Sequence, residues 1–186
     1  MGRRKSPTIF VQIAAYRDPQ LIPTIEDMIK NAKNPQHLRF GICRQYHPND
    51  GFDNLDQYRD DKRFRIVDVL CEYSNGVCWA RNQVQQLYKD EMYTLQIDSH
   101  MRFAENWDVE MIDMVKQLQD MGIPKPLLTG YVSSFNPEND PKGRVSEPWR
   151  MVFDRFIPEG AIFFLPETIP DWKELEQPVP SRFYSA

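Results

Sequence analysis

The stretch "SNGVCWARNQVQQLYKDEMYTLQIDSH", residues 74–100, contains two kinds of hydrophobic periodicity, and together they decide the fold. Its first part has apolar residues at helical spacing, namely Val77, Ala80, Val84, Leu87 and Tyr88. Its last part, "YTLQIDSH" (residues 93–100), has the length and composition of a buried strand. The strand finishes on Asp98, Ser99 and His100, which are costly to bury and hard to pair with one another. We therefore expect a helix from Ser74 and then a strand that delivers polar groups to a site.

The same alternation of helix and strand continues on both sides of this stretch. Strand patterns cover residues 8–16, 38–46, 64–70 and 126–132. An apolar stripe from Leu21 to Ala32 predicts a helix, with Asp18 as its N-cap and Pro19 at its first position. A second stripe from Trp107 to Met121 predicts another helix, which ends before Gly122. This order predicts an α/β fold with a mostly parallel central sheet flanked by helices. Ligands of such sheets bind beyond the carboxyl ends of the strands.

Composition and charge restrict the class of protein. The chain has 186 residues, of which 41% are hydrophobic and 27% are charged, as in a folded domain. Its net charge is −4, and it lacks the basic face that recognition of a phosphate backbone requires, so we expect no nucleic-acid partner. No apolar run approaches the roughly 20 residues of a membrane span, so we expect no membrane segment and no secretion signal in this chain. Cys43, Cys71 and Cys78 form neither a CxxC pair nor an even set, which favours reduced thiols and a cytoplasmic location.

Asp98 and His100 are candidate metal ligands. Residues i and i+2 of a strand share a face, so the two side chains would lie about 6.6 Å apart along the strand. A carboxylate and an imidazole suit Mn²⁺ or Mg²⁺ better than a metal that prefers thiolates. The alternative is that Asp98 caps a turn, Ser99 satisfies a backbone group and His100 lies in a solvated loop. Spacing alone does not separate these two interpretations.

Residues 74–108 resemble the donor-site core of GT-A glycosyltransferases. In that pattern a helix carrying Ala-Arg-Asn, here residues 80–82, precedes a strand that ends in D-x-D or D-x-H. The D-S-H form resembles that of the mucin-type polypeptide GalNAc-transferases. Together with residues 14–25 and 31–45, the sequence is most similar to a family of GlcNAc-transferases that modify polypeptides, including hydroxyproline on cytoplasmic proteins. The resemblance covers about residues 8–132.

The resemblance implies a role for each matching residue. Asp98 and His100 would hold a divalent metal, Mn²⁺ or alternatively Mg²⁺, that bridges the diphosphate of UDP, with Ser99 near the ribose or phosphates. Tyr16, Arg17 and Asp18 would lie by the uridine, and Arg81 would face the diphosphate or the donor sugar. Structural alternatives remain for each: Tyr16 could pack at the sheet edge, Asp18 could only cap a helix, and Arg81 could be a solvated helix residue. The resemblance identifies no catalytic residue.

The resemblance also implies an organisation and a function. Residues 1–186 would form a single GT-A domain, with a nucleotide-sugar-binding core over 8–132 and an acceptor-side loop and partial C-terminal part over 133–186. Relatives continue into a Gly-Glu-Glu element and a further metal-binding histidine, so we expect a C-terminally truncated domain. The implied function is metal-dependent transfer of GlcNAc from UDP-GlcNAc to a hydroxyl of a protein or glycan acceptor, with retention. The alternative is a non-catalytic nucleotide- or glycan-binding module of the same fold, and a nucleotidyltransferase is a weaker third choice.

Overall fold

The computed structural model describes residues 7–181. The chain divides into two compact units, Met1–Val109 and Glu110–Ala186, which are described separately below.

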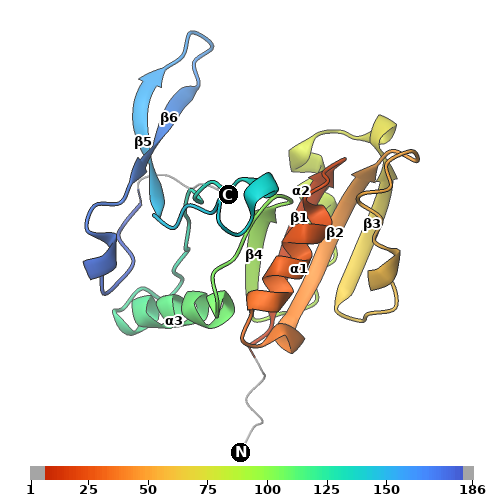
Figure 1. Ribbon diagram of the computed structural model, residues 1–186. Coiled ribbons are helices and arrows are strands. Elements are labelled where there is room, and N and C mark those ends of the chain that lie inside the picture. Colours follow the sequence, from red (N-terminus) through yellow and green to blue (C-terminus); the bar gives the residue numbers. More distant parts are fainter. Residues whose placement is uncertain (1–6, 182–186) are drawn as a thin grey trace, which may run out of the picture. The chain divides into compact units, whose positions relative to one another are not determined.

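The first unit is built on a four-stranded parallel sheet. Its strands are β1 (Ile9–Tyr16), β2 (Leu38–Tyr46), β3 (Phe64–Leu70) and β4 (Tyr93–Asp98). Their order across the sheet is β3-β2-β1-β4, and all neighbours are parallel (Figure 1). The predicted α/β fold with a parallel sheet flanked by helices is confirmed, and it is compatible with a Rossmann-like arrangement.

The helices that connect these strands lie on the two faces of the sheet. Helix α1 (Leu21–Asn31) connects β1 to β2 and lies in front of the sheet in Figure 1, while α2 (Val77–Gln85) connects β3 to β4. The connection from β1 to β2 moves the chain toward the β3 edge of the sheet. The connection from β3 to β4 moves it back past β2 and β1 to the opposite edge. Because such crossovers are right-handed, opposite directions place α1 and α2 on opposite faces. The direction of the chain therefore switches between β1 and β4.

Short 3₁₀ helices lie in this part of the chain, and a third α-helix begins in it and continues into the second unit. They are η1 (Pro35–His37), η2 (Asp56–Tyr58), η3 (Cys71–Tyr73) and α3 (Trp107–Asp120). The indole Nε1 of Trp107 donates to the carbonyl of Met28 at 3.0 Å, which anchors the start of α3 to α1. The fully buried residues Leu21, Ile25 and Met28 form the apolar face of α1.

The core under α2 is packed closely enough to require a glycine. Phe10, Cys43, Ala80 and Val84 form a buried cluster there. A Cβ atom at Gly41 would lie 2.4 Å from the ring of Phe10. Protein interiors are as dense as organic crystals, so this approach of ring to backbone leaves no room for a side chain.

Three predicted boundaries in the first unit are wrong. Helix α1 starts at Leu21 with Gln20 as its N-cap, because the Asp18 carboxylate binds the N–H of Gln20 in a turn before the helix. Helix α2 starts at Val77 rather than Ser74, because Gly76 before it has a φ of 87°. Strand β4 ends at Asp98 rather than His100, because the carbonyl of Ser99 accepts from the Thr24 hydroxyl of α1 instead of pairing with β1.

The second unit has a separate antiparallel hairpin. Strand β5 (Trp149–Phe156) pairs with β6 (Ile162–Thr168), and η4 (Pro137–Asn139) and η5 (Trp172–Glu174) lie in the connecting segments. The predicted strand over 126–132 is wrong, since only Tyr131 makes an isolated bridge, to Trp149. Pro126 has no N–H to donate, and Leu127 is 71% exposed, so this segment lacks both the hydrogen bonds and the burial of a strand. No helix within residues 7–181 is long and apolar enough to cross a membrane.

Candidate functional site

The carboxyl ends of β1 and β4 bring the predicted site residues together. Tyr16 ends β1 and is followed by Arg17 and Asp18, while Asp98 ends β4 and is followed by Ser99 and His100. The two strands are adjacent, with Ala14 paired to Asp98. Because the chain direction switches between these strands, their connections leave the sheet in opposite directions, and ligands of α/β sheets bind beyond the strand ends at such a point. The site therefore has the position at which α/β sheets bind their ligands.

Asp18 is the centre of a small polar cluster. The Ser99 hydroxyl donates to Oδ2 of Asp18 at 2.6 Å, and Nδ1 of His100 lies 2.7 Å from the same oxygen. Burial raises the pKa of Asp18, but hydrogen bonds from Ser99, His100 and the N–H of Gln20 together outweigh it and hold the pKa below its usual value. Asp18 is therefore a carboxylate at neutral pH and can only accept hydrogen bonds.

Asp98 has a different neighbour from His100. An Arg81 guanidinium nitrogen lies 3.2 Å from Oδ1 of Asp98, and the Asp98 side chain is 50% exposed. The His100 ring, 59% exposed, is next to Asp18 instead. Because β4 ends at Asp98, strand alternation does not extend to His100. No group of three or more His, Cys, Asp or Glu side chains that could hold a metal occurs among the described residues. Joint metal binding by Asp98 and His100 stays a prediction.

Tyr16 and Arg17 lie at the end of β1. Tyr16 is 54% exposed. Arg17 has a φ of 47°, a left-handed conformation that is uncommon outside glycine and is typical of functional sites. Its N–H donates to the carbonyl of Gln45 at 2.9 Å, and its guanidinium Nε donates to Asp50 at 2.6 Å. The Arg17 side chain thus pairs with the loop after β2, and its N–H ties the end of β1 to β2.

Two supporting residues were not identified from the sequence. The hydroxyl of Thr24, which is fully buried, donates to the carbonyl of Ser99 at 2.8 Å and accepts from the N–H of Met101 at 2.9 Å. Gln45, 3% exposed, donates to the carbonyl of Ala15 and accepts from the Ser74 hydroxyl. A buried polar residue near the end of an apolar strand, such as Gln45, is the signal that could have found this network.

Asp53, in the loop after β2, is an unusual buried carboxylate. It is 1% exposed, and neither of its carboxylate oxygens has a hydrogen-bond partner. Burial raises its pKa, and the nearby Arg44 guanidinium opposes that shift in part. Arg44 instead donates to the Asp53 carbonyl and pairs with Asp68 on β3. The uncompensated carboxylate destabilises the fold whenever it is ionised.

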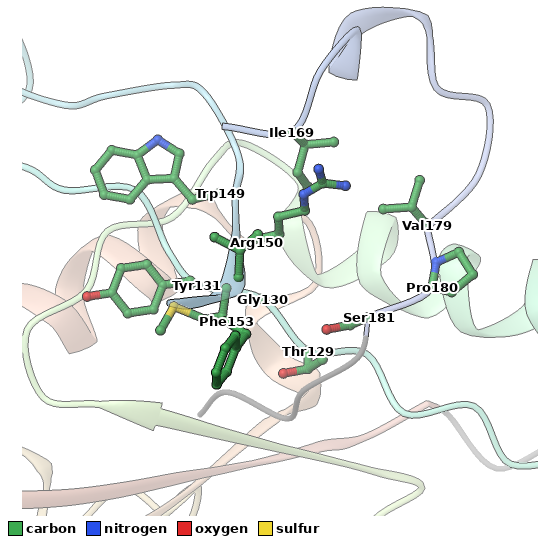
Figure 2. A pocket seen from close by; sticks show the side chains of 12 residues that line it. Thr129, Gly130, Tyr131, Trp149, Arg150, Phe153, Ile169, Val179, Pro180 and Ser181 are labelled. Carbon is green, nitrogen blue, oxygen red and sulfur yellow. The ribbon is translucent and has the colours of Figure 1, made fainter. Parts of the chain in front are cut away.

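The second unit contains a cavity of about 380 Å³ that includes none of the predicted site residues (Figure 2). The rings of Tyr131 and Trp149 stack along one side of it, 6.2 Å between centroids and 14° between planes. Thr129 and Ser181 contribute hydroxyl groups to its lining. Its volume is within the range of small-molecule pockets. The described residues therefore contain two separate features, the polar cluster at the sheet edge and this aromatic cavity.

Comparison with known protein families identifies the family of this chain. A family model described as Glycosyltransferase (GlcNAc) matches residues 8–62 and 51–186, which together span nearly the whole chain. The chain belongs to this glycosyltransferase family. Neither the curated proteins nor the solved structures gave a significant match to this glycosyltransferase.

Family membership confirms part of what the sequence predicts. A GlcNAc glycosyltransferase has a sugar donor and an acceptor as partners, so the broad prediction of a transferase is supported. The GT-A form of the fold, the link to polypeptide acceptors and hydroxyproline, and the relationship to GalNAc-transferases stay predictions. So do the metal, the donor residues, the single-domain organisation, the truncation and the cytoplasmic location.

Proposed function

We propose that this glycosyltransferase transfers GlcNAc from UDP-GlcNAc to a hydroxyl group of a protein or glycan acceptor, in a reaction that depends on a divalent metal. One observation carries the proposal: the Asp18, Ser99 and His100 cluster and the Arg81–Asp98 pair lie together at the carboxyl ends of β1 and β4. This edge of the sheet is the ligand position of α/β folds, and the family supplies the class of reaction.

The residues at this edge of the sheet fit a divalent metal such as Mn²⁺. Asp98 is half exposed and has a second carboxylate oxygen besides the one near Arg81. Contact of Nδ1 of His100 with Asp18 leaves Nε2 as the ring nitrogen available to a ligand. One carboxylate oxygen and one imidazole nitrogen leave several coordination positions for phosphate oxygens and water. A metal bound there would neutralise negative charge on the departing diphosphate.

The protein's own groups would bind and orient the donor. Arg81, held beside Asp98, adds positive charge at the carboxyl end of β4. Helix α2 begins at Val77 after η3, and the N–H groups of its first turn attract phosphate. The exposed ring of Tyr16 offers a flat surface for the uracil base. Such preorganised charge at a leaving group is often the largest contribution to catalysis.

We propose retention of configuration at the anomeric carbon. The bond from that carbon to the phosphate oxygen breaks, and the acceptor oxygen attaches on the same face. The acceptor's proton passes to the departing diphosphate, so no protein nucleophile is required.

The decisive experiment is calorimetric titration of UDP with and without Mn²⁺. We expect Mn²⁺ to strengthen UDP binding, and we expect Asp98→Asn and His100→Ala each to remove that effect. Asp61→Asn and His37→Ala are matched controls, because these residues precede β3 and β2 and lie at the amino edge of the sheet. Metal dependence that survives in Asp98→Asn would contradict the proposed metal site.

A non-catalytic binding module of the same fold is the second candidate. It is favoured by the lack of a three-residue metal cluster among residues 7–181. The two functions can be distinguished by hydrolysis of the donor. A transferase slowly hydrolyses UDP-GlcNAc when water takes the place of the acceptor, and a binding module does not. Release of UDP from UDP-GlcNAc in the presence of Mn²⁺, reduced in Arg81→Ala, is expected for the transferase. Binding of UDP-GlcNAc without any release of UDP would favour the module.

A further inference from the structure

The contact between His100 and Asp18 determines which ring nitrogen of His100 carries the proton. Asp18 is a carboxylate and has no hydrogen to donate, so Nδ1 of His100, 2.7 Å from Oδ2, must be the donor. In the neutral ring the proton is then on Nδ1, and Nε2 has a lone pair. A neutral histidine side chain in water prefers the other form, with its proton on Nε2. The carboxylate thus selects the tautomer that is less favoured in water.

Both partners of this contact are held in place by other bonds. Oδ1 of Asp18 accepts from the N–H of Gln20 at 2.8 Å, and the Asp18 side chain is only 15% exposed. On the other side, the backbone around His100 is fixed at Ser99 and Met101 by the buried hydroxyl of Thr24. The ring itself is 59% exposed. His100 is therefore oriented from the protein side and open to a ligand on the solvent side.

We propose that Asp18 is a positioning residue that fixes the orientation and tautomer of His100, so that Nε2 faces the divalent cation of the donor complex. This inference rests on the proposed function, because it requires a metal at Asp98 and His100. A histidine that binds a metal through one nitrogen commonly donates from the other to a carboxylate, and loss of that carboxylate typically weakens metal binding about 10- to 100-fold. Asp18 meets this description through a contact between residues 82 positions apart.

The substitution Asp18→Ser tests the inference with little risk to the fold. Serine can still accept from the N–H of Gln20, but its shorter side chain does not also reach His100. Asp18→Asn preserves size and shape without the charge, and it should weaken the same properties less. Asp27→Asn is the matched control, because Oδ2 of Asp27 accepts from the N–H of Phe103 and so supports the same loop.

Two measurements separate a positioning role from a merely structural one. The first is the ¹⁵N chemical shift of the His100 ring nitrogens without metal, which reports the tautomer directly. The chain has three histidines, so His100→Ala suffices to assign the signals. The second is Mn²⁺ binding in the presence of UDP, followed by the electron paramagnetic resonance signal of free Mn²⁺. We expect the Nδ1–H tautomer in wild type, its loss in Asp18→Ser, and about 10- to 100-fold weaker Mn²⁺ binding in that variant.

The contrary outcomes are distinct. A neutral Nε2–H tautomer in wild type, or Mn²⁺ binding in Asp18→Ser equal to wild type, would overturn this inference and leave the proposed function standing. An equal loss of Mn²⁺ binding in Asp27→Asn with an unchanged tautomer would assign the effect to the loop and also overturn the inference. A wild-type chain that binds no Mn²⁺ in the presence of UDP would overturn the proposed metal site, and the inference with it.

Discussion

Thr24 should stabilise the site loop through its hydroxyl more than through its methyl group. The side chain is fully buried, and its oxygen binds both the carbonyl of Ser99 and the N–H of Met101. Thr24→Val keeps the shape but leaves these two backbone groups without their partner. An unsatisfied buried group costs about 1–3 kcal/mol. Since the Met101 contact is only partly buried, we expect a total loss of about 2–4 kcal/mol of unfolding free energy.

The matched variant is Thr24→Ser, which keeps the hydroxyl and removes one methyl group. Its expected cost is about 1 kcal/mol, from lost burial and a small cavity. Urea unfolding followed by tryptophan fluorescence measures the loss of stability in both variants. The midpoints can be compared if the dependence of the unfolding free energy on urea concentration is the same as in wild type. In Thr24→Val the amide of Met101 should also exchange its hydrogen faster than in wild type. A loss in Thr24→Val no larger than that in Thr24→Ser would refute the reasoning.

Three further outcomes follow from packing and titration. Gly41→Ala should cost about 1–3 kcal/mol in urea unfolding, because its Cβ meets the Phe10 ring, whereas Gly51→Ala, with open space around it, should be nearly neutral. The pKa of Asp18 in the folded protein lies below its ordinary value of 3.8. The ionised carboxylate therefore contributes its full stabilisation of the fold above pH 3.8, and this contribution is lost as the pH falls through the folded-state pKa. Unfolding midpoints measured in acid should therefore fall less steeply in Asp18→Asn. The pKa of Asp53 is raised by burial, so wild type should lose stability as the pH rises through that pKa, and Asp53→Asn should remove this loss.

Local patterns predicted the elements of the first unit well. Strands β1, β2 and β3 have nearly the predicted bounds. For β1, which is buried along most of its length, the reason is that a strand covered on both faces needs a continuous apolar run. The errors fell where a tertiary contact or a special backbone angle changed an end. Asp18 is an example, since its carboxylate contacts Ser99 and His100 rather than acting as the N-cap of α1.

The second unit was predicted less well for a physical reason. The segment 126–132 has apolar residues, but an apolar run becomes a strand only when a neighbour supplies hydrogen bonds and burial. Tyr131 makes a single isolated bridge, to Trp149, and residues 126–132 form no strand. The apolar runs that follow paired with each other as β5 and β6 instead of extending the parallel sheet.

The sequence by itself determined that polar residues stand at the carboxyl ends of two strands, since periodicity locates strand ends and parallel sheets place those ends at one edge. Only the tertiary structure decided which of these residues meet. The order β3-β2-β1-β4 puts β1 beside β4, although 76 residues separate the end of one from the start of the other. This adjacency joins Asp18 to Ser99 and His100, and α2 brings Arg81 to Asp98. Such pairings depend on crossover direction and helix packing, which no local pattern of residues encodes.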